Sequence, residues 1–326
     1  MIQVSELHRQ AGDRLQNVSG NPKKLALIHA AIALGSSFLV SLAALLCNYL
    51  IADTSGLDGM GMRAILSTAQ SALEVVLMLA LPLWQMGIFY AALRWTSRET
   101  ASVADLAQGF RRVRSVLGVL LLQGGLFLAL SLPISYIGTA VFLLSPFSVP
   151  FMELLAPYME QGAISNEVLE AMATTETAEA FAYAAIPLLV ICGILYAIVA
   201  IPMFYRTRFS NFAVMDGLPA FSAFLKSFSI TKKNSLGIFF LDLRFWWFYV
   251  LQLLTVAMCY ADVLLPLVGV TMPFSPVVNS LIAYCIGSVC QCLLLWQFEA
   301  HRVTVYGLAY CALDGTLNAD SGEEAI

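Results

Sequence analysis

The hydrophobic residues of this chain gather into six long runs separated by more polar segments. The runs cover approximately residues 25–51, 64–93, 116–144, 183–205, 236–265 and 277–300. About 20 residues of helix cross the ~30 Å hydrocarbon core of a bilayer, so each run is long enough to span it. The pattern predicts an all-α, polytopic membrane helical bundle with six transmembrane helices.

The Lys and Arg residues occupy alternate gaps between these runs. Fifteen of the 17 lie before the first run, between the second and third, between the fourth and fifth, or after the sixth. Arg63 lies on the other side, and Arg244 lies within the fifth run or at its edge. Because cytoplasmic loops are enriched in Lys and Arg, both termini are predicted to be cytoplasmic. The chain then divides into a cytoplasmic amphipathic N-terminal segment (1–24), a six-span membrane domain (25–303) and a cytoplasmic acidic tail (304–326).

Composition agrees with this class and excludes others. Hydrophobic residues make up 60% of the chain and charged residues 12%, too few for the surface of a soluble domain of this size. The net charge of -4 says little about a nucleic-acid partner, but the basic face and the site motif that such a protein would show are both missing. The seven Cys residues have no paired spacing, and no metalloprotease, nucleophile-elbow or phosphate-loop motif is present. We therefore predict no metal, no cofactor, no catalytic residues and no enzymatic activity.

The segment 145–182 is predicted to be the long outer loop. It carries six glutamates and no basic residue: Glu153, Glu160, Glu167, Glu170, Glu176 and Glu179. Such a loop could bind cations or a basic partner. A solvated cap over the bundle is the favoured interpretation, because the alternating oxygen ligands of a calcium loop are missing.

Three cytoplasmic segments carry an apolar stripe at helical spacing. The stripes are Val4, Leu7, Ala11 and Leu15; Val103, Leu106, Phe110 and Val113; and Phe221, Phe224, Leu225 and Phe228. Helices of this kind lie in the headgroup plane and bring their cations to anionic lipid headgroups. A groove for a ligand or a membrane-protein partner is the alternative, but anchoring to the bilayer already explains the stripes.

Each amphipathic segment precedes an odd-numbered run, which suggests a parallel internal repeat of helical hairpins. Residues 117–123 match residues 236–242 in character, so Gly118 corresponds to Gly237 and Gln123 to Asp242. Superposition of hairpins 102–205 and 218–310 should bring these pairs together.

Polar residues in and beside the runs are the candidates for function, because such groups are expensive within a membrane. The candidate polar cluster comprises Asp242, Arg244, Glu299, Arg302, Gln123 and Gln85. Hydrogen bonding between helices is its simpler role, and a substrate path is the sharper one. We expect Arg244 to pair with Glu299, and Asp242 to face Arg302 or a helix of the preceding loop.

The fifth run is unusually long. Thirty residues of helix measure roughly 45 Å, which exceeds a ~30 Å core. Either this helix is strongly tilted or its first turns lie in the interface. Trp246 and Trp247 favour the interface, where indoles prefer to lie.

The stretch 224–247 supports a resemblance through Phe224-Leu225-Lys226-Ser227, Ser235-Leu236-Gly237-Ile238-Phe239-Phe240-Leu241-Asp242-Leu243 and Trp246-Trp247. It resembles a family of uncharacterised bacterial six-span integral membrane proteins, distantly similar to the membrane domain of glycerophosphodiester phosphodiesterases. The resemblance implies a helical domain of the bacterial inner membrane without an assigned reaction or functional residues.

Two functions are compatible with these sequence features. The first is a non-enzymatic membrane scaffold or accessory component. The second is a small-molecule or lipid transporter with a path between the helical repeats, which a polar-lined cavity at mid-membrane would favour.

Overall fold

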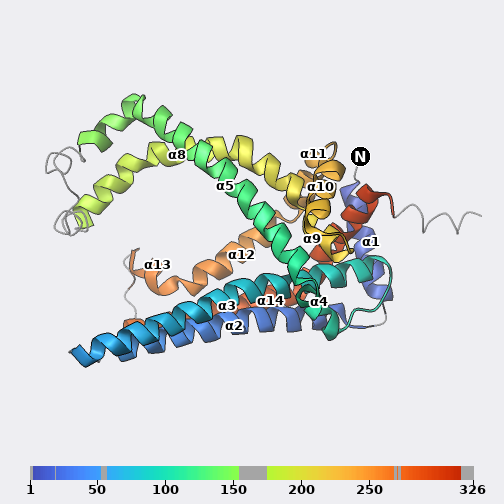
Figure 1. The fold of residues 1–326 in the computed structure, drawn as a ribbon, viewed down its shortest axis with the longest axis horizontal. Coiled ribbons are helices and arrows are strands. Elements are labelled where there is room, and N and C mark those ends of the chain that lie inside the picture. Colours follow the sequence, from blue (N-terminus) through green and yellow to red (C-terminus); the bar gives the residue numbers. More distant parts are fainter. Residues whose placement is uncertain are drawn as a thin grey trace, which may run out of the picture. The chain divides into compact units, whose positions relative to one another are not determined.

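The computed structural model describes residues 3–18, 20–52, 57–153, 175–267, 270 and 273–316. Its α-helices are α1 (Val4–Asn17), α2 (Pro22–Ala52), α3 (Leu57–Thr96), α4 (Gln108–Arg111), α5 (Val113–Leu143), α8 (Thr175–Thr207), α9 (Ser210–Met215), α10 (Ala220–Thr231), α11 (Ser235–Arg244), α12 (Trp246–Cys259), α13 (Ala261–Leu267) and α14 (Pro276–Asp314). Two 3₁₀ turns, η1 (Val103–Ala107) and η2 (Pro146–Ser148), complete the order (Figure 1). These residues contain no strand, so the predicted all-α class is confirmed.

Among the described residues, five helical segments are long and apolar enough to cross a membrane. They are Pro22–Ala43, Ala64–Thr96, Val113–Leu143, Tyr183–Met215 and Val278–Asp314. A sixth span exists if α11 and α12 are counted together. The chain is therefore a polytopic helical bundle with five or six candidate spans, as the hydrophobic runs predicted.

The fifth run is broken rather than straight. Helix α11 ends at Arg244, α12 begins at Trp246, and the two axes differ by 59°. Phe245 forms the corner with its side chain buried, and its N–H donates to the Asp242 carbonyl at 2.9 Å. The bend makes neither helix longer than a bilayer core, which removes the excess length noted in the sequence.

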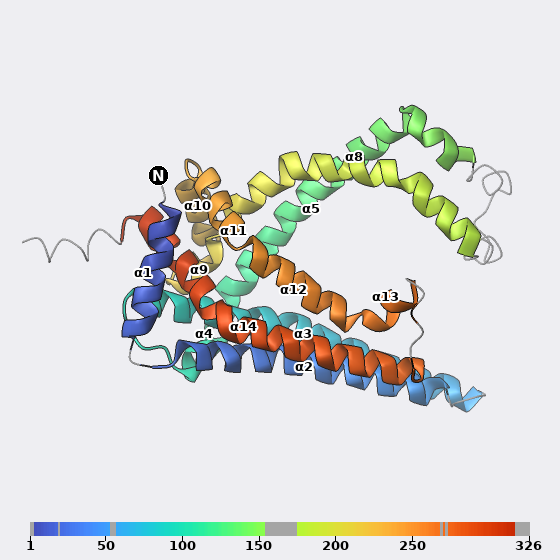
Figure 2. The ribbon, with the colours of Figure 1, turned by 180° about the vertical axis from the view of Figure 1, so that it is seen from behind.

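The chain separates into two compact units, unit 1 (1–119 and 208–326) and unit 2 (120–207). In unit 1, the long helices α2, α3 and α14 pack along one another, and α12 packs on α14 (Figures 1 and 2). Helix α1 packs against the C-terminal part of α14, near α11. The core of unit 1 therefore lies at the end where α14 meets the short helices, and its largest buried side chains include Trp95, Phe209 and Tyr310.

Close backbone contact holds η1 and α4 against α3. A Cβ placed on Gly87 would overlap the Leu106 carbonyl, and one placed on Gly109 would overlap the Leu83 carbonyl. Only glycine permits this approach of two backbones. The segment after α3 is thereby fixed to the helix that precedes it.

The first and third amphipathic segments are helical, as predicted. The stripe of α1 is turned toward the protein, since Leu7 and Ala11 are buried. Helix α10 instead buries small residues, including Ala223 and Ser227, and exposes Phe221.

The second amphipathic segment corrects the prediction. It is a 3₁₀ turn followed by the one-turn helix α4, and only Leu106 of its stripe is buried. The Asp105 carboxylate accepts hydrogen bonds from the Ser102 N–H at 2.7 Å and the Ser102 hydroxyl at 2.9 Å. This capping box starts the segment as a tight 3₁₀ turn, so the stripe does not continue along one regular α-helix.

In unit 2, α5 and α8 meet where Gly138 faces the Cys192 side chain. Both helices are otherwise largely uncovered. None of the residues in the most apolar window of α8 is buried, and only 11% of those in the corresponding window of α5 are.

The C-terminal boundary of the membrane domain also differs from the prediction. Helix α14 continues past residue 303 to Asp314, where Gly315 ends it in a left-handed conformation (φ 81°). The continuation is folded because Val305, Leu308 and Ala309 are buried in the core of unit 1. The remainder of the predicted tail, 317–326, and the loop residues 154–174 lie outside the described residues.

Candidate functional site

The six predicted polar residues do not form one cluster. Asp242, Glu299 and Arg302 come together with three residues that the sequence did not single out: Arg208, Tyr249 and Tyr306. We call these six residues the Asp242 cluster. They come from the turn before α9, from α11, from α12 and from α14.

One oxygen of Asp242 is the centre of this cluster. Its Oδ1 accepts hydrogen bonds from Arg208 Nη2 at 3.0 Å, from the Tyr249 hydroxyl at 3.1 Å and from the Tyr306 hydroxyl. The Asp242 side chain is only 13% exposed and that of Arg208 21% exposed. The prediction that Asp242 faces Arg302 or a helix of the preceding loop is met only in part, because its partner Arg208 lies in that loop but on a turn.

Glu299 and Arg302 form the second ion pair of the cluster. Arg302 Nε and Nη2 donate to the two Glu299 oxygens at 2.9 and 2.7 Å, a bidentate geometry. The Arg302 guanidinium also lies over the rings of Phe248 and Tyr306, 5.2 and 5.9 Å from their centroids. Arg208 lies over the same Tyr306 ring at 4.7 Å, so this tyrosine joins the two ion pairs.

The cluster contains two cations and two carboxylates, and each is paired within it. A buried ion pair of this kind is strongly sensitive to loss of one partner, because the other charge is then left uncompensated. The hydroxyls of Tyr249 and Tyr306 lie 3.1 Å apart, and both donate to the same Asp242 oxygen. The arrangement links α11, α12 and α14, and its charged groups are paired with one another.

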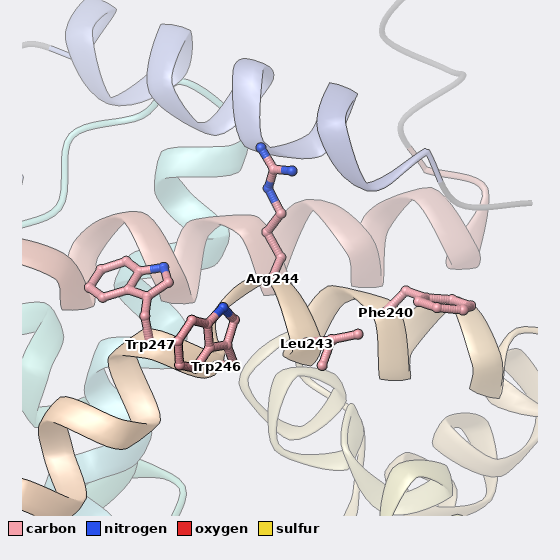
Figure 3. Close-up of a pocket in the computed structure, with 5 residues that line it drawn as sticks. All are labelled: Phe240, Leu243, Arg244, Trp246 and Trp247. Atoms are coloured by element: carbon pink, nitrogen blue, oxygen red, sulfur yellow. The ribbon is translucent and has the colours of Figure 1, made fainter.

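The predicted pairing of Arg244 with Glu299 is wrong. Glu299 is occupied by Arg302, one turn along the same helix, which needs no approach of a second helix. Arg244 is exposed at the end of α11, and among the described residues it makes no hydrogen bond or ion pair. Figure 3 shows its side chain extending from the α11–α12 bend toward α1, with Trp246 and Trp247 beside the bend.

Arg244 lines two cavities of unit 1. The first is a cavity of about 480 Å³, which we call the Arg244 pocket. It lies among α1, the start of α2, the α11–α12 bend and α14, and it is lined by His8, Gly12, Leu15, Gln16, Lys23, Arg244, Phe245, Trp247, Gln297, Phe298 and His301. The second is a groove of about 600 Å³, which we call the Trp246 groove, lined by Phe240, Leu243, Arg244, Trp246 and Trp247 (Figure 3).

Two histidines meet in the Arg244 pocket. His8 Nδ1 and His301 Nε2 are 3.2 Å apart, so one of these nitrogens donates to the other. Burial, then the adjacent His301, and then the Arg244 cation lower the pKa of His8 to about 4. His8 is therefore neutral at neutral pH, and its buried Nε2 has no hydrogen-bond partner among the described residues.

The two glutamines of the predicted cluster lie elsewhere. Gln123 belongs to unit 2, where its amide donates to the Thr207 carbonyl at 3.4 Å. Gln85 is exposed on α3, and no partner is found for it among the described residues. Gln85 is therefore not a member of the Asp242 cluster, and Gln123 belongs to the other compact unit.

The sequence contained a signal for part of the missed set. Glu299, Arg302 and Tyr306 are spaced by three and four residues and so share one face of α14. Arg208 could not have been found this way, because it reaches Asp242 across 34 positions of chain.

Several cations outside the Asp242 cluster and the Arg244 pocket also hold neighbouring segments together. Arg112 Nη1 donates to the Val214 and Met215 carbonyls at 2.7 and 3.0 Å, which caps the C-terminus of α9. Lys226 pairs with Asp314 at 2.9 Å, and Arg94 with Asp105 at 3.1 Å. Several cations that the charge pattern had made available to lipid are thus used within the fold.

Within the described ranges, no three His, Cys, Asp or Glu side chains are placed to hold a metal ion together. Comparison of the chain with protein-family models, curated proteins and solved structures found no match.

Proposed function

We propose that this protein is a non-enzymatic scaffold or accessory component of the bacterial inner membrane, with both termini in the cytoplasm. The distribution of Lys and Arg supports this orientation, since 15 of the 17 lie in the segments assigned to one side. In this role the protein docks a helix of another membrane protein and does no chemistry of its own.

The observation that carries the proposal is the uncovered surface of unit 2. Helix α5 exposes Gly125 and Ala129, and α8 exposes Gly193 and Ala197. A Cβ added to either glycine would meet no atom within 4 Å. Small residues four apart let two membrane helices approach closely, and such pairs are enriched where spans associate.

The Asp242 cluster supports the same role from unit 1. Its charges are paired within the cluster and hold α11, α12 and α14 together, which stabilises the arrangement of these helices in unit 1. A transporter or an enzyme would need polar groups that remain available to a substrate. The cluster offers its charged groups to one another instead.

The test is site-directed photo-crosslinking in the native membrane. A photoreactive amino acid replaces Leu132, which lies two turns along α5 from Gly125 and is 57% exposed. Phe127, 58% exposed, lies on a different face and is the control position. We expect a discrete protein adduct from position 132 and lipid adducts from position 127.

Two matched variants decide what the adduct means. Gly125→Ile should abolish it, because the added bulk prevents close helix approach. Gly124→Ile adds equal bulk about 100° around the helix and should leave the adduct unchanged. If position 132 yields only lipid adducts, or if both variants act alike, no partner span docks on this face and the proposal fails.

A further inference from the structure

We infer that the Arg244 pocket and the Trp246 groove together form a binding site for an anionic phospholipid, with the phosphate in the pocket and an acyl chain along the groove. The inference does not rest on the proposed scaffold role, because that role uses α5 and α8 of unit 2. It follows from the charge, the shape and the continuity of two cavities in unit 1.

The Arg244 pocket has the chemistry of an anion site. Arg244 and Lys23 bring two cations to it from different helices, and no carboxylate is among the described residues that line it. Arg244 makes no ion pair there, whereas Arg208 is paired with Asp242 and Arg302 with Glu299. An unmatched guanidinium beside apolar walls is a ready partner for a phosphate, which it can bind in bidentate fashion.

The pocket also offers neutral donors. Gln16 and Gln297 line it, and Lys23 Nζ already donates to Gln297 Oε1 at 3.2 Å, which holds that ammonium at the rim. When His301 donates to His8 Nδ1, the His8 Nε2 carries a proton that no described residue accepts. Its volume of about 480 Å³ falls within the roughly 300–1,000 Å³ of small-molecule sites.

The Trp246 groove supplies the apolar half of the site. Phe240, Leu243 and Trp246 are 56%, 51% and 60% exposed, so the groove is open along its length. Arg244 and Trp247 line both cavities, and the charged group therefore lies where the apolar groove begins (Figure 3). A cation at one end of an aromatic groove matches an amphiphile with a phosphate head, whereas a free phosphate would leave the groove unfilled.

The 59° bend creates this arrangement. In a continuous helix, Arg244 and Trp247 would lie about one turn apart on the same helix face. The break at Phe245 separates α11 from α12, and His8 of α1 packs against the Phe245 ring at 4.8 Å between centroids. The pocket therefore depends on α1 being docked at the corner.

The test is native mass spectrometry of the full chain, purified in detergent and delipidated. The probes are dioleoyl phosphatidylglycerol, dioleoyl phosphatidylcholine with the same chains and a zwitterionic head, and inorganic phosphate. We expect phosphatidylglycerol to bind at least about tenfold more tightly than phosphatidylcholine, which corresponds to one charge contact of about 1.4 kcal/mol. Inorganic phosphate should bind more weakly than either, because it cannot use the groove.

Variants locate the bound lipid. Arg244→Gln should weaken phosphatidylglycerol binding about tenfold, a loss of about 1.4 kcal/mol. Lys232→Gln removes an exposed cation that lines neither cavity and should have no effect. Gln16 is exposed on the pocket wall, so Gln16→Glu should weaken binding and Gln16→Lys should strengthen it without disturbing the core.

Three results would each overturn the inference. The first is equal affinity for the two lipids, which indicates partition onto any apolar surface. The second is an equal response to Arg244→Gln and Lys232→Gln, or no opposite response of the two Gln16 variants. The third is phosphate binding as tight as that of phosphatidylglycerol, which identifies a site for a free anion rather than a lipid.

Discussion

Asp242 and Arg244 lie two residues apart at the end of α11, in opposite electrostatic settings. Asp242 is 13% exposed and accepts three hydrogen bonds within a cluster whose charges are all matched. Arg244 is exposed, lines two cavities and has no ionic partner among the described residues. A matched charge in the core stabilises one arrangement of helices, while an unmatched charge beside a cavity remains available for a ligand. The charge of a residue therefore says less about its role than what the fold places opposite it.

The largest effect on stability should come from breaking the Asp242 cluster. Asp242→Leu leaves Arg208 buried without a carboxylate, and we expect a loss of about 3–5 kcal/mol in the free energy of unfolding. Equilibrium unfolding in detergent measures it. The control is Glu6→Gln, which breaks the exposed Glu6–Arg9 pair and should cause little or no loss. Equal losses from the two variants would show that Asp242 is not a structural centre.

A double-mutant cycle separates the two arginines near Glu299. Glu299→Leu and Arg302→Met should couple by about 0.5–3 kcal/mol, because the double variant removes both buried charges together. The matched cycle of Glu299→Leu with Arg244→Met should be additive within about 0.5 kcal/mol, since those residues share no contact. Both cycles use unfolding in detergent. Coupling in the Arg244 cycle alone would restore the pairing that the structure argues against.

The smallest effect concerns pH and the docking of α1. Because the folded-state pKa of His8 is lowered to about 4, the released segment binds more protons between pH 4 and 6.5. Docking is therefore at full strength above pH 6.5 and weakens as the pH falls toward 4. The groups that face His8 in the pocket are His301, Arg244 and Lys23, and none of them provides a negative charge that would oppose this trend.

Hydrogen exchange of α1 at pH 7.5 and pH 5 measures that docking. We expect lower protection of residues 4–17 at pH 5 in the wild-type protein, after division by the intrinsic amide exchange rate, which itself falls as the pH falls. His8→Gln cannot be protonated in this range, so the pH response should be reduced. Protection of α1 that is the same at both pH values in the wild-type protein would contradict the burial of a neutral His8.

The Arg244 pocket and the Asp242 cluster also show which predictions the sequence could support. The apolar runs predicted all the candidate spans, and the stripe of Leu7 and Ala11 correctly predicted a helix at 4–17. These succeed because helical periodicity and span length are local properties that a bilayer or a core imposes on any chain. The parallel repeat stays a prediction, although α5 is continuous through Gln123 whereas α11 ends two residues after Asp242.

The candidate site was predicted less well. Asp242, Glu299 and Arg302 were correctly grouped, but Arg244 was given the wrong partner. Gln85 is not a member of the cluster, and Gln123 belongs to the other compact unit. Residues at the same depth in neighbouring spans can face any direction around their helices. Depth can be read from the sequence, whereas rotation about the helix axis is decided by packing.

The sequence by itself determined that this is a helical, multi-span chain and that polar groups gather near the start of the fifth run and the end of the sixth. Only the tertiary structure decided which of those charged groups pair with one another and which remain available to a ligand. The deciding features are the bend at Phe245 and the contact of Arg208 with Asp242, which joins residues 34 positions apart. Hydrophobic pattern acts within a segment, but the pairing of charges depends on distances between segments, and packing alone sets those distances.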